Sequence, residues 1–245
     1  MPRFFIAETP KAGEEFLIVG EDAHHIARSL RMRVGETLTL CAPGAVDCFC
    51  EIIGFMEDGV MVRVSALNEN EAEPLWQVTI YQCLPKSDKL EQVIQKSTEL
   101  GAVRIQPVQS SRCVARMDQG AVRKKLPRWQ RIALEAAKQS GRGRIPLLSP
   151  PLGLREALQE AVSLGTAIFF YEAGGEPLKA ILKENSVDQS IGVFIGPEGG
   201  FDPKEAQLAK DLGAHIATLG KRILRTETVS AAVLAMIFYE RDDLQ

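Results

Sequence analysis

Hydrophobic positions follow two different patterns along the chain, and the change falls near residue 70. Before it, short runs rich in aromatic and β-branched residues are separated by Gly, Pro and Asp, a pattern that predicts β-strands. These runs are RFFIA, EEFLIV, ETLTLCA, DCFCEIIGF and VMVRVSAL. Between the second and the third, EDAHHIARSLRM predicts a helix that begins at an Asp22 N-cap and places Ile26 and Leu30 on its apolar face. Several short strands with tight turns indicate a small β-barrel.

After the polar stretch NENEAEP, which predicts a linker, strands and helices alternate. Strands are predicted in QVTIYQCLP, VRIQPV, TAIFFYEAGG, SIGVFIG and HIATLG. Helices are predicted in KSDKLEQVIQKSTELG, LREALQEAVSLG, EPLKAILKEN, DPKEAQLAKDLG and residues 227–241, and in the basic run AVRKKLPRWQRIALEAAKQSG, which Pro127 is expected to break. This alternation predicts a parallel sheet covered on both faces. The expected domains are a barrel over residues 1–72 and an α/β domain over residues 73–245.

Three loops follow strands of the predicted parallel sheet, where ligands of such sheets bind. They are YEAGG, GPEGG and LGKRILRTET. None has the glycine spacing of a dinucleotide site or a P-loop. The GPEGG loop also carries Glu198, whose charge would repel a phosphate in a pocket of low dielectric. Glycines that allow close backbone approach, a rigid Pro197 and one carboxylate suit a flat heteroaromatic ligand with positive charge.

A structural alternative stays open for each of these loops. GPEGG is also compatible with a plain turn that places Glu198 near the N-terminus of the next helix, where its charge is favourable. In the third loop, Thr226 and Thr228 are candidate caps of a helix whose apolar face is Val229, Ala232, Val233, Met236 and Ile237. Ile223 and Leu224 stand between arginines, so they either pack inward or wall a pocket for a ring.

Composition limits the class of protein. Hydrophobic residues make up 45% of the chain and charged residues 25%, as in soluble globular proteins. The N-terminus lacks the apolar stretch of a signal peptide, and no run approaches the roughly 20 apolar residues that span a bilayer. The five cysteines form no C-x-x-C pair, so we expect reduced cytoplasmic thiols and no metal site. His24 and His25 are adjacent on a helix and point in different directions, which also disfavours a metal pair.

Charge is distributed unevenly. Residues 1–72 hold 6 basic and 12 acidic side chains, whereas residues 73–245 hold 23 and 20. Residues 112–144 alone contain ten Lys or Arg against Asp118 and Glu135. Such an excess indicates a polyanion-binding surface, although a solvated helix face has the same composition.

Motifs spread over essentially the whole chain carry a resemblance to a known family. The motifs are RFF, HIARSLRMRVGE, LPKSDKLEQVIQKSTELGAVRIQP, KQSGR, IGPEGGF and LGKRILRTETVSAAV. Together they resemble the RsmE-type 16S ribosomal RNA uridine N3-methyltransferases of the SPOUT superfamily. Two departures are Lys138, where the family pattern has an acidic residue, and Val229, where alanine is commoner.

The resemblance implies a PUA-like RNA-binding barrel and a SPOUT domain with a trefoil knot, which strand and helix patterns alone do not reveal. It also implies a homodimer in the cytoplasm that acts on 16S rRNA of the small ribosomal subunit and binds S-adenosyl-L-methionine. The cofactor residues implied are Phe170, Tyr171, Glu172, Ile195, Gly196, Pro197, Glu198, Gly199, Gly200, Leu219, Gly220, Arg222, Ile223, Leu224, Thr226 and Thr228.

Methylation of uracil N3 removes a proton and leaves negative charge on O2 and O4, so a fixed cation and a nearby base are useful. The candidates are Arg225 as the cation and Glu198 and Glu227 as carboxylates, with an ion pair between Arg225 and one of them as the structural alternative. The residues expected to contact RNA are Arg3, His25, Arg28, Arg31, Arg33, Arg112, Arg116, Gln139, Arg142 and Arg144.

Two other functions are compatible with the same features. One is a knotted methyltransferase for another RNA position, such as a ribose 2′-hydroxyl. The other is an RNA-binding ribosome assembly factor without catalysis. Binding of S-adenosylmethionine separates the second from both enzymes, and mapping of the modified nucleotide separates the two enzymes.

Overall fold

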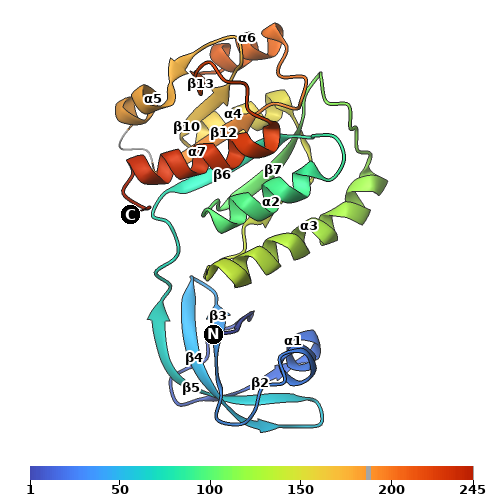
Figure 1. Ribbon diagram of the computed structural model, residues 1–245, viewed down its shortest axis with the longest axis vertical. Coiled ribbons are helices and arrows are strands. Elements are labelled where there is room, and N and C mark those ends of the chain that lie inside the picture. The colour runs from blue at the N-terminus through green and yellow to red at the C-terminus, as the bar shows by residue number, and fades with distance from the viewer. Residues whose placement is uncertain (186–188, 245) are drawn as a thin grey trace. The chain divides into compact units, whose positions relative to one another are not determined.

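The computed structural model describes residues 1–185 and 189–244 (Figure 1). It divides into two compact units. The first unit contains Met1–Glu73 and Ala137–Arg144, and the second contains Pro74–Ala136 and Ile145–Gln245. The segment 137–144 therefore belongs with the N-terminal residues, a feature that the sequence did not indicate.

A five-stranded sheet forms the first unit, and all five predicted strands are present. They are β1 (Arg3–Phe5), β2 (Glu15–Val19), β3 (Thr37–Ala42), β4 (Val46–Phe55) and β5 (Gly59–Glu69), in the order β1-β3-β4-β5-β2. Alternate positions of the strands point inward, as the β-period requires. They build a core with Phe4, Ile18, Leu38, Leu40 and Ile52, and both Cys48 and Cys50 are buried in it.

The helix of the first unit begins earlier than predicted. It consists of α1 (Gly20–His24) and a π-helical turn, η1 (His25–Ser29), with Val19 as N-cap, so the prediction of Asp22 as the N-cap is wrong. Asp22 instead bonds to the ammonium of Lys138 at 3.0 Å. Lys138 also lies 5.2 Å from the centre of the Phe4 ring. The family departure at Lys138 thus has a local carboxylate partner.

Residues 70–73, predicted as a linker, are held by hydrogen bonds. Asn70 donates to Asp47 and to the carbonyl of Gly141, both at 3.0 Å. Glu73 accepts from the guanidinium of Arg142 and from the backbone N–H groups of Gly143 and Arg144. The segment is therefore an ordered part of the first unit, and the chain passes to the second unit within the predicted linker, between Glu73 and Pro74.

The second unit is built on a parallel sheet, which confirms the prediction from strand and helix alternation. Its order is β11-β13-β10-β12-β6-β7-β8, and β9 also pairs with β7. The strands are β6 (Gln77–Cys83), β7 (Arg104–Gln109), β8 (Leu147–Leu148), β9 (Leu152–Gly153), β10 (Thr166–Phe170), β11 (Glu176–Pro177), β12 (Ser190–Ile195) and β13 (His215–Thr218).

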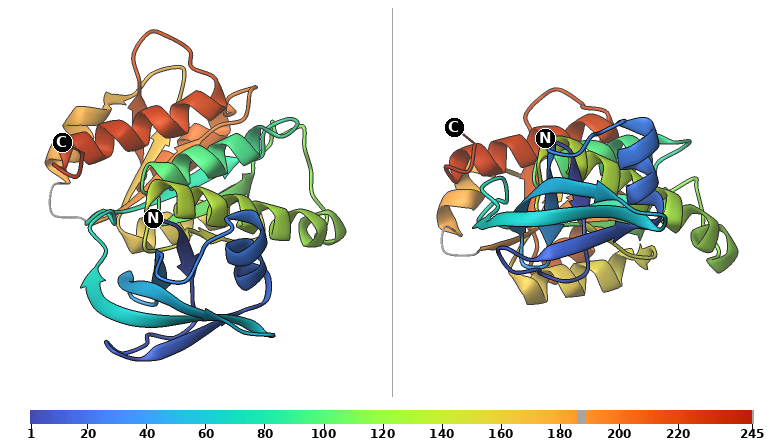
Figure 2. Two further views of the ribbon diagram at one scale, coloured as in Figure 1. Left: turned by 60° about the horizontal axis from the view of Figure 1, so that its bottom comes forward. Right: turned by 90° about the horizontal axis from the view of Figure 1, so that it is seen from below.

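Helices cover this sheet on both faces. They are α2 (Lys89–Glu99), α3 (Gln119–Ser140), α4 (Leu154–Leu164), α5 (Leu178–Glu184), α6 (Pro203–Asp211) and α7 (Thr226–Glu240). Helices α2 and α7 pack together on one face, and α4 lies on the other (Figure 2). The core between them includes Tyr81, Phe169, Phe194 and Phe238. The trefoil knot implied by the resemblance stays a prediction.

Two helices differ from the sequence expectation. Pro127 does not break α3, which runs on through it. Pro127 is exposed, so the carbonyl that loses its partner there is open to water, while Trp129 and Ala133 bury the opposite side. In α7, Val233 and Ile237 are buried as expected, but Met236 is 41% exposed, and the buried side also carries Ser230, Leu234 and Phe238. Since α7 is apolar on nearly all sides, its periodicity could not identify the buried face.

Candidate functional site

Three neighbouring strands deliver their following loops to one edge of the sheet. Strand β10 pairs in parallel with β12 on one side and with β13 on the other. Parallel strands end at the same edge, so the loops that follow these strands, at residues 171–175, 196–202 and 219–225, come together there. These are the three loops selected from the sequence.

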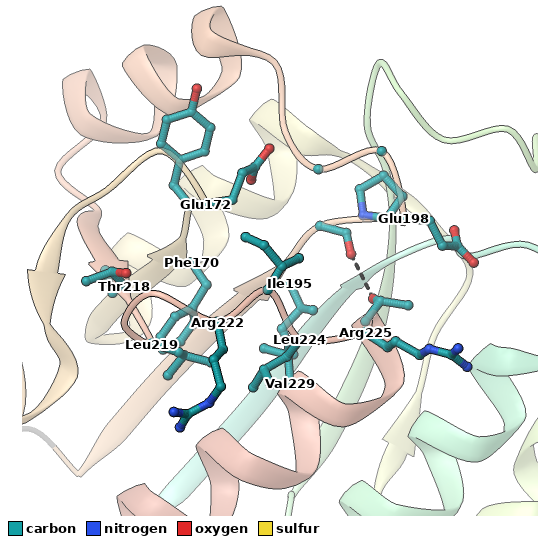
Figure 3. Close-up of a pocket in the computed structure, with 18 of the residues that line it drawn as sticks. Phe170, Glu172, Ile195, Glu198, Thr218, Leu219, Arg222, Leu224, Arg225 and Val229 are labelled. Carbon is teal, nitrogen blue, oxygen red and sulfur yellow. Dashed lines mark hydrogen bonds between the residues drawn. The ribbon is translucent and has the colours of Figure 1, made fainter.

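The loops enclose a pocket of about 800 Å³, large enough for a nucleoside-sized ligand (Figure 3). Its lining includes the whole predicted cofactor set except Thr228, together with Arg225. Residues that the prediction missed also line it, namely Lys89, Ala217, Thr218 and Val229. Phe170, Ile195, Leu219, Leu224 and Val229 gather at its centre, whereas Ile223 is 79% exposed. The pocket therefore has an apolar floor with charged groups around it.

The GPEGG loop has a defined shape. Gly200 has a φ of +65°, and its N–H donates to the carbonyl of Pro197 at 2.9 Å. A Cβ at Gly200 would collide with the carboxylate of Glu172, which lies against this backbone. After the loop, Asp202 and Glu205 form a capping box at the start of α6. The positive φ favours glycine at position 200, and a larger residue there would also displace the Glu172 carboxylate.

Thr226 joins the second and third loops. Its hydroxyl donates to the carbonyl of Gly196 at 2.8 Å and accepts from the side-chain amide of Gln82 at 2.8 Å (Figure 3). Thr226 is 5% exposed, and the N-cap of α7 is Arg225, without a side-chain cap. The capping interpretation of Thr226 and Thr228 is therefore wrong. Thr226 fixes the distance between two walls of the pocket.

Lys89 connects the two candidate carboxylates. Its ammonium lies 3.0 Å from Glu198 and 3.5 Å from Glu227. The Lys86 N–H also donates to Glu198. Partial burial opposes ionisation of Glu198, but hydrogen bonds from its own backbone, Lys89 and Lys86 prevail and lower its pKa. Glu198 is therefore an ionised, hydrogen-bonded group with reduced basicity.

The position of Lys89 could have been suspected from the sequence. It is the first residue of α2, and α2 follows β6, which pairs directly with β12. The sequence shows the strand and the helix but not that β6 lies beside the strand that ends in GPEGG. Strand order is the missing information.

Arg225, like Arg222, is a cation of the pocket that has no partner carboxylate among the described residues. In the described part of the chain it forms no ion pair, so the alternative of a pair with Glu198 or Glu227 is not found. Arg222 is also exposed at the pocket, and the two arginines extend in different directions from their loop (Figure 3). Arg225 is therefore available for a ligand.

The residues expected to contact RNA fall into two groups. Arg142 is 2% exposed and bonded to Glu73, so its guanidinium is not on the surface; that expectation is corrected. Arg3 is half-buried against Asp47, and Arg112 bonds to Asp202 and to the Gly199 carbonyl at 3.1 Å. The others are exposed: His25, Arg28, Arg31, Arg33, Arg116, Gln139 and Arg144.

Two features are absent from the described residues. No group of three or more His, Cys, Asp or Glu side chains is arranged to hold a metal ion. Among those residues, no helix combines the length and the apolar character needed to cross a membrane. All five cysteines are buried and unpaired with one another as disulfides.

Comparison with known proteins defines the class first. Residues 71–238 match the model of an RNA methyltransferase domain, and residues 18–64 match that of an RNA methyltransferase PUA domain. The parallel sheet with its loop pocket and the small sheet therefore make up an RNA methyltransferase with a PUA domain.

Relatives define the family within that class. The chain is 35% identical to ribosomal RNA small subunit methyltransferase E of Bacillus subtilis, over 100% of this chain and 99% of the relative. It is 33% identical to the protein of that name from Mycobacterium bovis, over 96% and 90%. The crystal structure of the Neisseria gonorrhoeae protein bound to S-adenosyl methionine superposes with a TM-score of 0.88 at 32% identity, covering 98% of this chain and 97% of that one. The chain belongs to the ribosomal RNA small subunit methyltransferase E family.

Proposed function

We propose that the protein transfers a methyl group from S-adenosylmethionine to N3 of one uridine in 16S rRNA of the small ribosomal subunit. The observation that carries the proposal is the pocket formed by the three loops, in a chain that matches its relatives over nearly the full length. The uridine N3 position follows from the RsmE-type motifs. The proposed roles are RNA docking for residues 1–72 and catalysis for residues 73–245.

The chemistry of the pocket fits the cofactor. Its apolar floor suits an adenine ring, and the Glu172 and Glu198 carboxylates suit the ammonium and sulfonium charges. Gly199 and Gly200 line the pocket with backbone atoms, because neither residue has a side chain. When bound, S-adenosylmethionine supplies an electrophilic methyl group. The predicted cofactor residues other than Thr228, with Lys89, Ala217, Thr218 and Val229 added, would hold it.

The residues of the chain act on the uracil ring. We assign Arg225 the role of stabilising the negative charge that O2 and O4 carry once the N3 proton has left. Glu198 has a lowered pKa and is a weak proton acceptor, so we assign it and Glu227 to holding Lys89 in place. The N3 proton passes to water at the open mouth of the pocket.

We also propose a cytoplasmic homodimer in which the partner copy completes the active site. Exposed apolar residues support a contact surface on and near α7: Ile223, Met236 and Tyr239 are 79%, 41% and 72% exposed. Sedimentation of the purified protein tests this, since a monomer at micromolar concentration would contradict it.

The main test is direct. Purified protein, labelled S-adenosylmethionine and 30S subunits from a strain lacking this gene should yield one methylated uridine, with the label at N3. Label on a ribose hydroxyl would identify a 2′-O-methyltransferase instead. Cofactor binding without transfer to any RNA would favour an assembly factor.

A further inference from the structure

The first half of α3 carries positive charge that the pocket does not use. Residues 119–131 contain five basic and no acidic side chains: Arg123, Lys124, Lys125, Arg128 and Arg131. Asp118, just before the helix, is engaged, because its carboxylate accepts the Ala121 N–H at 2.7 Å. The charge of this segment is therefore not balanced by its own neighbours in sequence.

Four of the five side chains also lack a partner in the fold. Arg128 bonds to Glu91 of α2 at 2.7 Å and so fastens the two helices together. The other four, together with Arg116 in the preceding loop, are exposed and make no ion pair within residues 1–185 and 189–244: Arg123, Lys124, Lys125 and Arg131. Glu135 is the one acidic residue of α3, and it is not paired with them.

These cations lie away from the core side of the helix. Trp129, Ala133 and Ala137 are at most 2% exposed and define the buried side. At 3.6 residues per turn, Lys124 and Arg131 lie on the opposite side, seven residues apart and about 10 Å along the axis. The structure thus presents a line of flexible cations rather than a single point charge.

The surface has the character of a nucleic-acid site rather than a protein interface. No large hydrophobic residue of α3 is exposed in the described chain. A protein partner would need an apolar centre for its contact, whereas a phosphate backbone needs only repeated positive charge. Charge complementarity therefore selects a polyanion.

The location connects this surface to the pocket. Figure 1 shows the N-terminal ends of α2, α3 and α7 on the same side of the second unit. Lys89 is the first residue of α2, and Arg225 is the N-cap of α7. An RNA strand bound along the start of α3 therefore lies on the same side of the second unit as these pocket residues.

We propose that Arg116, Arg123, Lys124, Lys125 and Arg131, which we call the α3 basic stripe, bind the phosphate backbone of the substrate RNA next to the methylated nucleotide. The inference rests on the proposed function for the identity of its RNA. It places an RNA contact of the second unit on the first half of α3, whereas Arg142, which is buried and belongs to the first unit, is excluded as an RNA contact.

The test replaces the four helical residues of the stripe by glutamine in the full-length protein: Arg123→Gln, Lys124→Gln, Lys125→Gln and Arg131→Gln. The probe is deproteinised 16S rRNA, with Kd measured at several salt concentrations. Each lost phosphate contact lowers the slope of log K against log salt by roughly 0.7–0.9, so we expect a fall of about 3 in total. Near physiological salt, Kd should rise about tenfold to a hundredfold.

A matched control carries the same change of charge elsewhere on the domain. Arg155→Gln, Lys183→Gln, Lys204→Gln and Lys210→Gln lie on α4, α5 and α6 and are exposed. The control should bind RNA like the unaltered protein. Equal weakening in both variants would show that only net charge matters, and this would overturn the proposal.

Two further measurements separate this proposal from the proposed function. Calorimetric titration with S-adenosylmethionine should give the same affinity for the unaltered protein and both variants. If the unaltered protein binds 16S rRNA but transfers no methyl group, the proposed function is wrong. The proposal for the α3 basic stripe is then unaffected. A stripe variant that binds 16S rRNA normally but fails to bind whole 30S subunits would instead assign the surface to a ribosomal protein and overturn the proposal.

Discussion

Basic side chains at the two ends of α3 meet different surroundings. At its C-terminal end and two residues beyond it, Lys138 bonds to Asp22 and Arg142 to Glu73, and all four residues belong to the first unit. In its first half, Lys124 and Arg131 are exposed without a carboxylate. The same residue types are therefore structural at one end and free for a ligand at the other. Charge alone does not distinguish the two, but the presence of a carboxylate partner in the fold does.

The pocket also contains cations with and without a carboxylate partner. Lys89 is bound between Glu198 and Glu227, whereas Arg225 makes no ion pair in the described chain. If the contrast holds, changes to paired cations should alter stability, and changes to unpaired cations should alter binding or rate.

The largest effect is expected for Arg142→Met. Removing this guanidinium leaves the Glu73 carboxylate, 11% exposed, without its charged partner. Breaking a buried pair from one side costs about 3–5 kcal/mol of the free energy of unfolding. Denaturant titration measures it. The control is Arg144→Met, an exposed side chain two residues away that should change stability by less than about 0.5 kcal/mol. Equal losses for the two would show that the pairing of Arg142 is unimportant.

Arg225→Met should act on the rate instead. Loss of a group that stabilises charge in the transition state lowers kcat by roughly 10²–10³-fold. Thermal stability and S-adenosylmethionine affinity should stay close to those of the unaltered protein, because Arg225 has no ion-pair partner to lose. Single-turnover methylation of 30S subunits provides the measurement. Arg222→Met, in the same loop, should have a smaller effect, and the reverse order would exchange the roles of the two arginines.

Thr226→Val tests the uncharged contact by which Thr226 joins two loops of the pocket. The substitution removes the hydrogen bonds to Gly196 and Gln82, so that the Gly196 carbonyl loses this donor and the buried Gln82 amide loses one of its acceptors, which costs about 1–3 kcal/mol. Cofactor affinity should fall as well, because the two loops are no longer joined. Thr226→Ser keeps the hydroxyl and should retain most of both properties. Identical behaviour of the Val and Ser variants would contradict the bridging role.

The smallest effect is expected for Lys89→Met, and it should depend on pH. The pKa of Glu198 is lowered in the folded protein, so its contribution to stability is complete above the unfolded value of about 4.3 and disappears as pH falls through the folded value. The difference in Tm between Lys89→Met and the unaltered protein should therefore be present at pH 7 and shrink below about pH 4. Lys86→Met is the control, because Lys86 reaches Glu198 through its backbone N–H. A Tm difference that persists in acid would exclude the ion pair between Lys89 and Glu198 as its origin.

The repeating features of the chain could be predicted from the sequence. Runs of β-branched residues gave the strands, and the loops after β10, β12 and β13 were selected because parallel strands end at one edge. The pocket lining agreed with the resemblance at nearly every position, although the role of each lining residue stays a prediction. Local pattern and loop chemistry carry this information.

Partners distant in sequence could not be predicted. In the sequence Asp22 resembles a helix cap, but in the structure it pairs with Lys138. Thr226 also resembles a cap, but its hydroxyl bonds to Gly196 and Gln82. Arg142 resembles a surface cation until Glu73 is found against it. Each of these pairs is separated by at least thirty residues, and which members meet depends on strand order and packing.

The segment 137–144 limits how the gene can recombine during evolution. The chain enters the first unit at its N-terminus, leaves after Glu73, returns at Ala137 and leaves again after Arg144. A gene fragment that ends at residue 73 would encode the five strands but omit the residues that satisfy Asn70 and Glu73. Recombination at a single breakpoint therefore cannot transplant this RNA-binding module intact. Two separate stretches of the gene must be transferred together. The small domain and the catalytic domain are therefore expected to have evolved as a single unit.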